Sequence, residues 1–209
     1  MAYAYVKADQ VVKILNTSQP FTDPATEIQH SSNIFSLWTD EEKAKIGLYP
    51  VQQSGMVDNN FYTQSATTYN FDKEKNIVYE VIESKEKNIN DVNEVDADGK
   101  PLLDDKGKQV VTKGLKSIWI ETTKKTAYNL LLPTDWYIIR NVEDNTQAIP
   151  SDVVSFRKNV KTACTTIETA INNCDTLEKI KTLFIVPVDS EGKVTGNAPI
   201  NDFPEPYES

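Results

Sequence analysis

The sequence contains few of the residues on which catalysis and cofactor binding usually depend. Of its 209 residues, only one is histidine, two are cysteine and seven are glycine. His30 has no nucleophile signature near it, and no glycine-rich loop is present to cradle a phosphate. No carboxylate pair is marked out for acid–base work. We therefore expect a protein that is not an enzyme and that holds no cofactor.

Basic residues and long apolar runs are also scarce. The 22 Lys and Arg against 31 Asp and Glu give a formal charge of -9. Because binding to a phosphate backbone needs clustered basic residues, we expect no nucleic-acid partner. No apolar run approaches the roughly 18 to 20 residues that cross a bilayer, and the N-terminal residues do not resemble a signal peptide. The pattern predicts a chain made and used without secretion and without a membrane.

The two cysteines, Cys164 and Cys174, are ten residues apart. On one continuous helix their Cα atoms would be about 15 Å apart, whereas a disulfide tolerates about 7 Å. Two thiols without a nearby histidine also make a poor zinc site. We interpret them as small buried apolar side chains and expect no metal.

The arrangement of the remaining residues predicts an α+β chain in four parts. They are a β-rich N-terminal domain with one short helix (1–84), a charged, exposed hairpin arm or linker (85–114), a helical domain of three to four helices (115–184) and an extended C-terminal tail (185–209). Short runs of β-branched and aromatic residues predict strands at 3–6, 10–15, 48–51, 60–63, 68–71 and 76–81. Thr39 and Glu42 have the spacing of a capping box, and Gly47 would end the helix over 40–46.

The arm contains a short repeat. "DADGKPLL" (96–103) is followed directly by "DDKGKQVV" (104–111), and "DSEGKV" (189–194) repeats the turn. Asp followed three residues later by Gly is typical of a β-turn, so we predict three hairpin turns. The alternative is a calcium loop with Gly99 at its sixth position. Pro101 and Asp105 depart from that pattern, and we favour turns.

A helical pattern begins at Lys116 and predicts a corner between two helices. Pro133 should end the first helix, and the hydroxyl of Thr134 should cap the N-terminus of the second. The negative charge of Asp135 should be stabilised there by the helix dipole. We interpret Trp136, with Ile138 and Ile139, as packing between helices; the alternative is an exposed aromatic binding surface.

Two arginines follow the corner. Arg140 could pair with Glu143 or Asp144, or brace the corner through carbonyl contacts. The next helix, capped by Ser151, carries the clearest apolar stripe of the chain, with Arg157 turned away from it; a capping box at Asp175 and Glu178 opens a last short helix.

The stretch "LLLPTDWYIIRNVEDNTQAIPSDVVSFRKNVKTACTTIETAINNC" (130–174) resembles a segment of tail-fibre assembly and tail-associated proteins of tailed bacteriophages. The shared elements are the leucine run Leu130 to Leu132, Pro133 to Trp136, Arg140, Pro150 and the pair Phe156–Arg157. "SLWTDEEKAKIGLYPV" (36–51) resembles a module found upstream in such proteins. Together the two stretches cover about a third of the chain.

The resemblance implies a structural protein of the virion tail, made in the host cytoplasm. Its partners would be other tail proteins (fibre, baseplate or neck subunits) in an assembly of several copies, and it supplies no catalytic residue. A fibre-assembly chaperone absent from the mature virion is the main alternative, and a host-cell interaction domain is another. The candidate interaction and helix-corner residues are Pro133, Thr134, Asp135, Trp136, Arg140, Phe156 and Arg157.

Overall fold

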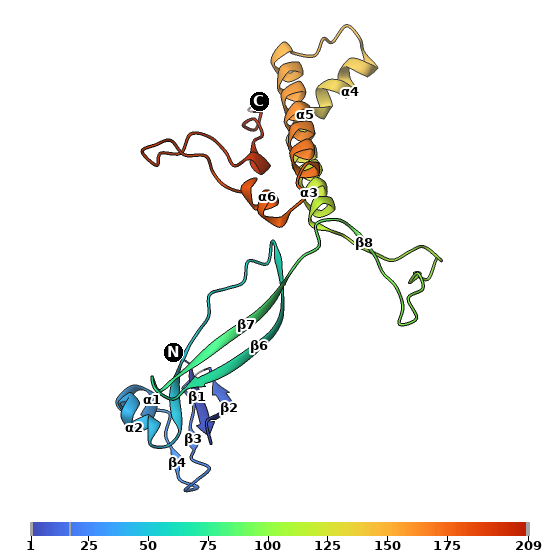
Figure 1. Ribbon diagram of the computed structural model, residues 1–209. Helices are drawn as coiled ribbons and strands as arrows, with labels where there is room; N and C mark the ends of the chain where they lie inside the picture. The colour runs from blue at the N-terminus through green and yellow to red at the C-terminus, as the bar shows by residue number, and fades with distance from the viewer. Residues whose placement is uncertain (1, 17, 208–209) are drawn as a thin grey trace. The chain divides into compact units, whose positions relative to one another are not determined.

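The computed structural model describes residues 2–16 and 18–207, and the chain forms two compact units, Met1–Glu86 and Lys87–Ser209 (Figure 1). The first unit is β-rich and the second is mainly helical, which confirms the predicted α+β class. Each unit has a buried apolar core of its own.

The N-terminal unit is built on a five-stranded sheet in the order β2-β1-β5-β7-β6. The strands are β1 (Tyr3–Lys7), β2 (Gln10–Leu15), β5 (Leu48–Gln52), β6 (Tyr62–Asp72) and β7 (Ile77–Glu86). The β5–β7 pairing is parallel and the other neighbouring pairs are antiparallel. The outermost strands β2 and β6 lie close to each other, so the sheet curls toward a barrel. Two short strands, β3 (Phe21–Thr22) and β4 (Gln29–His30), form a separate pair.

The prediction of two strands at 60–63 and 68–71 was wrong, because the single strand β6 begins within the first range and continues through the second. Its register with β7 shifts between Gln64 and Ala66, and pairing continues on either side of that bulge. In the sequence, the polar residues at 64, 65 and 67 separate the two apolar runs. The long antiparallel partner instead supplies ladder hydrogen bonds along the whole stretch.

Two short helices, α1 (Ile34–Leu37) and α2 (Asp40–Ala44), stand where one was predicted. The capping box of α2 is confirmed: Glu42 N donates to Thr39 Oγ1 at 3.2 Å, and Thr39 N donates to Glu42 Oε2 at 2.8 Å. Gly47 has the positive φ expected after the helix, at 76°, and an added Cβ would lie 2.8 Å from Val6 O. The additional helix α1 buries Ile34 against the core.

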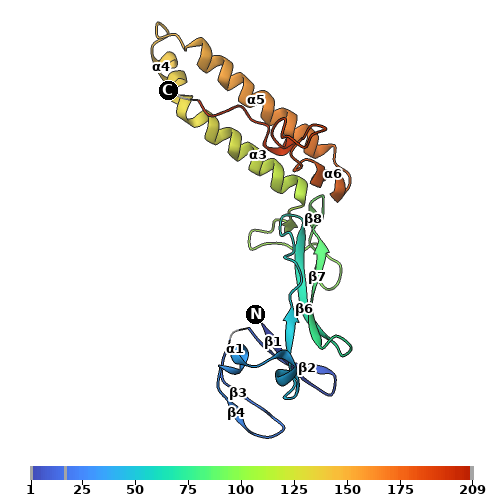
Figure 2. The ribbon, with the colours of Figure 1, turned by 90° about the vertical axis from the view of Figure 1, so that its left-hand side faces the viewer.

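The C-terminal unit is organised around two helices that lie side by side and run in opposite directions (Figure 2). They are α3 (Leu115–Leu131) and α5 (Ser151–Asn172); η1 (Leu132–Thr134), α4 (Asp135–Glu143), α6 (Leu177–Thr182) and η2 (Pro199–Asn201) complete the unit. The predicted stripe of α5 is buried at Val153, Val160, Ile167 and Ile171. Two predicted caps were wrong: Pro150, without a side-chain cap, precedes α5, and Thr176 rather than Asp175 caps α6.

The predicted extended tail over 185–209 is present, since residues 185–197 are exposed and most described residues of the tail have no regular secondary structure, but part of it packs on the helices. Val188 and Val194 pair across the third predicted turn, and η2 follows it. Ala198 and Ile200 are buried against Ile167 of α5, with aromatic side chains around them. Apolar residues spaced between prolines therefore give the tail a surface with which to pack on its own helices.

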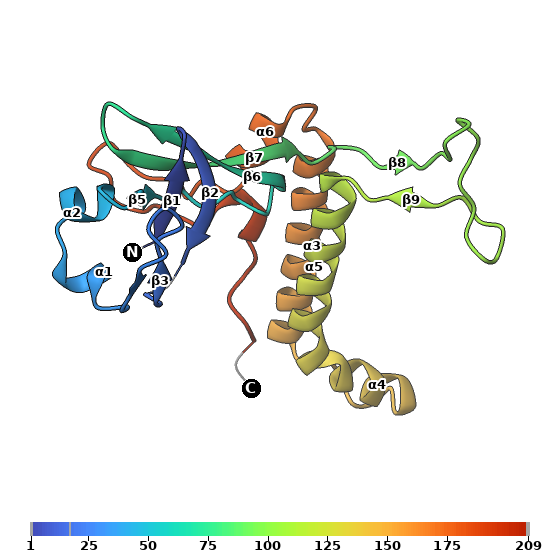
Figure 3. The same ribbon diagram turned by 90° about the horizontal axis from the view of Figure 1, so that it is seen from below.

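The arm is a hairpin with two smaller hairpins at its end, and Figure 3 shows it extending from the start of α3. Its stem pairs β8 (Val92–Asn93) with β9 (Val111–Thr112). Beyond the stem, Glu94, Leu102 and Val110 form a ring of backbone hydrogen bonds of 2.8 to 2.9 Å. Gln109 Nε2 lies 2.7 to 3.2 Å from the carbonyl oxygens of the same three residues. The eight-residue repeat thus becomes a three-way junction.

The three predicted turns are confirmed. In each, the first aspartate accepts through Oδ1 from the backbone N–H groups two and four residues later, at 2.8 to 2.9 Å. Gly99, Gly107 and Gly192 have φ values of 78°, 75° and 80°. Oδ1 of each of these carboxylates therefore serves the turn itself, as aspartate commonly does in β-turns.

Candidate protein-interaction surface on the helical unit

The predicted corner between α3 and α4 is present, and its centre is closed to solvent. Pro133 lies in η1, directly between the two helices. Thr134 is 0% exposed, and its Oγ1 donates to Leu131 O at 2.8 Å. Thr134 occupies the N-cap position of α4, as predicted, but its hydroxyl does not cap the helix. With φ -104° and ψ 0°, the backbone of Thr134 stays helical, and the hydroxyl turns back to Leu131 O.

Arg157 is the side chain that braces this corner. Its Nη1 donates to Asp135 Oδ1 at 2.7 Å, to Thr134 Oγ1 at 2.7 Å and to Leu131 O at 3.1 Å. Only 15% of the Arg157 side chain is exposed. The prediction that Arg157 faces away from the packed side of α5 was therefore wrong. The position of Arg157 beside the apolar stripe could have indicated its bracing role. The side chain of arginine is long, so its guanidinium can reach groups on a neighbouring helix.

The helix that follows the corner buries none of its side chains. Trp136 is 49% exposed, Ile139 58% and Val142 78%. The prediction that Trp136 and Ile139 pack between helices was wrong, and the alternative of an exposed surface fits the structure. We call Trp136, Ile139 and Val142 the apolar face of α4. Ile138 is the partly buried member of the predicted set.

Arg140 lies over aromatic rings of its own helix. Its Cζ is 4.8 Å from the ring centroid of Trp136 and 5.5 Å from that of Tyr137. Among the residues that the structure describes, no carboxylate forms an ion pair with it, so the predicted pairing with Glu143 or Asp144 was wrong, as was its role as the brace. Cation–π contact instead holds Trp136 in place at the surface.

Phe156 joins the tail to the start of α5. Its ring centroid is 5.6 Å from that of Tyr207, and Tyr207 Oη donates to Asp152 Oδ2 at 2.9 Å. The hydrogen bond to Asp152, then burial, raises the pKa of Tyr207 to about 12. The same bond lowers the pKa of Asp152 below its usual range. The aromatic half of the predicted Phe156–Arg157 pair thus holds the tail, and the arginine holds the corner.

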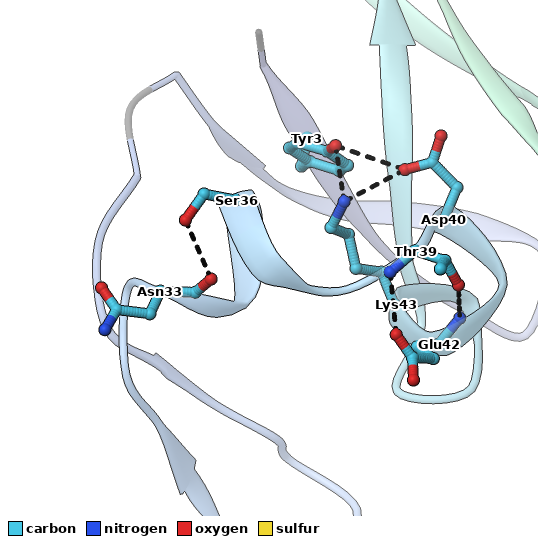
Figure 4. Close-up of polar contacts among 7 residues, drawn as sticks. All are labelled: Tyr3, Asn33, Ser36, Thr39, Asp40, Glu42 and Lys43. Atoms are coloured by element: carbon cyan, nitrogen blue, oxygen red, sulfur yellow. Dashed lines mark hydrogen bonds and ion pairs between the residues drawn. The ribbon is translucent and has the colours of Figure 1, made fainter.

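A buried cation lies in the N-terminal unit, between α2 and β1 (Figure 4). Lys43 Nζ donates to Tyr3 Oη at 2.9 Å and to Asp40 Oδ1 at 3.2 Å. Burial works against its charge, but the hydrogen bonds to Tyr3 and Asp40 raise the pKa of Lys43 above its usual value. A lysine acts as a nucleophile when its pKa is lowered, so this cluster ties a helix to a strand and does not activate an amine.

The two cysteines are free thiols, and neither is activated. Burial, followed by contact with Glu168, raises the pKa of Cys164 to about 11. Cys164 Sγ donates to Glu168 Oε1 at 3.2 Å. Cys174 is buried and lies beyond the end of α5, so the two are not on one helix as assumed. Reactive cysteines have a lowered pKa, which neither thiol shows.

Within residues 2–16 and 18–207, no group of three or more His, Cys, Asp or Glu side chains could hold a metal ion. No helix in this part of the chain is long and apolar enough to cross a membrane. Comparison with known proteins found no matching family model, no matching curated protein and no matching solved structure. The resemblance to phage tail proteins therefore stays a prediction.

Proposed function

We propose that this chain is a non-enzymatic structural protein of a bacteriophage tail, joining subunits at the baseplate, the neck or a fibre attachment. The observation that carries the proposal is the apolar face of α4. A helix with Trp136, Ile139 and Val142 at 49% to 78% exposure has apolar surface to bury against a partner. Such burial contributes roughly 25 cal/mol per Å² of apolar area, and aromatic side chains are common anchors at interfaces.

The resemblance supports the same surface. Its most specific elements are the continuous stretch Leu130 to Trp136 and the pair Phe156–Arg157, which begins 20 residues after Trp136. In the structure Arg157 contacts Leu131, Thr134 and Asp135, so these elements form one local unit. Residues that resemble the phage segment thus build the corner that presents the apolar face of α4.

The arm supplies a second surface for neighbours. Val95, Leu102 and Leu103 lie around its three-way junction and are 56%, 42% and 55% exposed. Two separate contact surfaces on one chain suit a protein that joins different subunits, or several copies of itself, in the virion. In the tail, Ala198, Ile200 and Phe203 pack on α3 and α5, whereas residues 185–197 are exposed.

Quantitative mass spectrometry of purified particles tests the proposal. We expect the chain in a fixed ratio to the other tail proteins, through every purification step. Absence from particles, with the chain abundant in infected cells, contradicts a structural role. Co-expression with candidate fibre proteins would then identify the chaperone alternative, which predicts more soluble trimer and no chain in the final complex.

A further inference from the structure

A groove of about 390 Å³ lies between α4 and α5. Its apolar wall is formed by Ile138, Ile149 and Val154. Val154 is 50% exposed, although its neighbour Val153 is fully buried against the core. The groove thus offers apolar contact area that the unit itself leaves uncovered.

The other wall of the groove is cationic. Arg157, Lys158 and Lys161 line it. Arg157 is already engaged with Asp135, but among the described residues no carboxylate forms a salt bridge with Lys158 or Lys161. Two unpaired cations beside an apolar wall favour a ligand that is both anionic and apolar.

The tail lies on another side of α5. It contacts Asp152, Phe156 and Ile167, whereas the groove uses Val154, Lys158 and Lys161. At 100° per residue these two sets point to opposite faces of the helix. The tail of the same chain therefore leaves the groove open.

The groove continues onto the apolar face of α4. Around the axis of that helix, Val142 lies about 40° from Ile138, and Ile139 lies about 60° further in the same direction. An occupant of the groove would therefore also meet side chains that are 58% and 78% exposed, at Ile139 and Val142. A nucleic-acid backbone would leave this apolar surface uncovered, and a small anion would not span it.

We propose that the groove binds an acidic, apolar peptide segment of a partner protein. Its apolar side chains lie over Ile138 and Val154, and its carboxylates meet Lys158 and Lys161. The inference rests on the proposed function, since it names the chemistry of the partner that a joining protein would hold at this corner.

Selection from a display library of random linear peptides tests the inference with the full chain as target. We expect the selected peptides to combine Asp or Glu with apolar residues, and to bind more weakly as salt is raised. Selected peptides without acidic residues, or no selection above an unrelated target, would overturn the inference.

Charge reversal locates the binding. Replacing the two unpaired groove cations, Lys158→Glu with Lys161→Glu, should weaken the affinity for the selected peptides by about tenfold or more. The control, Lys106→Glu with Lys108→Glu in the arm, changes the net charge equally and should leave affinity unchanged. Val154→Asp removes apolar contact and should also weaken binding. Equal loss in the arm control, or no loss in the groove variants, contradicts the assignment.

The two proposals can fail separately. If the chain is present in particles but does not bind acidic peptides, only the peptide-binding inference is overturned. A chain absent from particles, and without effect on fibre folding, overturns the tail function, while peptide binding at the groove can still be measured.

Discussion

Arg157 Nη1 lies 2.7 Å from Asp135 Oδ1, and this ion pair connects α5 to the first residue of α4. The same nitrogen contacts Thr134 Oγ1 and Leu131 O. One guanidinium therefore sets the direction in which α4 leaves the corner, and with it the placement of the apolar face.

Arg157→Ala should destabilise the helical unit by about 2 kcal/mol, because it leaves the partners of a charged donor unsatisfied at a partly buried site. Chemical denaturation followed by circular dichroism measures the change. Lys158→Ala, one residue along and exposed, is the control and should stay within about 0.5 kcal/mol of wild type. Equal stability of the two variants would rule out the brace.

Gly114 joins the arm to α3 and has no room for a side chain. An added Cβ would lie 2.3 Å from Asn90 C and 2.4 Å from Asn90 O. Gly114→Ala should therefore cost about 1 to 3 kcal/mol, typical of overpacking, and should increase hydrogen exchange at Leu115 N, which donates to Asn88 O at 2.8 Å.

Gly196→Ala is the matched control, since its added Cβ meets only Pro187 Cγ at 3.6 Å. It should leave stability and exchange almost unchanged. If Gly114→Ala were equally neutral, the close approach of the arm to α3 would be wrong.

The tail contact should depend on pH in a defined direction. The hydrogen bond to Asp152 raises the pKa of Tyr207 to about 12. The contribution of Tyr207 to stability is therefore fully present below the ordinary phenol pKa and is lost as the pH rises through about 12. Because the pKa of Asp152 is lowered, its contribution to stability is fully present above the ordinary carboxyl pKa. That contribution is lost as the pH falls through the lowered pKa of Asp152. We expect the contact to persist from about pH 4 to about pH 10.

Tyrosine ¹³C NMR titration measures this directly. One phenol should titrate near 12, and Tyr207→Phe should remove its signal. Asp152→Asn should bring the pKa of the same phenol closer to its usual value. A late-titrating signal that both variants leave unchanged would assign the effect to another tyrosine.

Cys164 should be slow to alkylate in the native chain, because its pKa is raised to about 11. Glu168→Gln removes one cause of that rise and should increase the thiolate fraction, and hence the rate, several-fold. Iodoacetamide labelling at pH 8 with peptide mass spectrometry follows each thiol separately. Cys174, with no contact to Glu168 among the described hydrogen bonds, serves as the internal control.

Local features of the chain could be predicted from the sequence, because each depends on a few neighbouring residues. The capping box of Thr39 and Glu42, the positive φ of Gly47 and the glycine turns of the arm are of this kind. The corner at Pro133 follows from the same logic, since proline restricts the residue before it.

The errors concern what a side chain meets after folding. Trp136 and Ile139 have a helical apolar pattern, but no element of the described unit covers them. Arg157 braces the corner, which was a role considered for Arg140. Helical periodicity gives the direction in which a side chain leaves the helix, but not the carbonyl and carboxylate oxygens that it can reach. In the tail, the apolar residues around Ala198 and Ile200 are too few to show a periodicity, so the sequence did not indicate that they pack on the helices.

The central claim is that this chain acts through the apolar face of α4, and the most direct measurement is complementation of a phage lacking the gene. Ile139→Asp with Val142→Asp changes two exposed side chains, so the melting temperature of the protein should not move. We expect the yield of infectious particles to fall at least about tenfold. A stable double variant that restores the wild-type yield would contradict it.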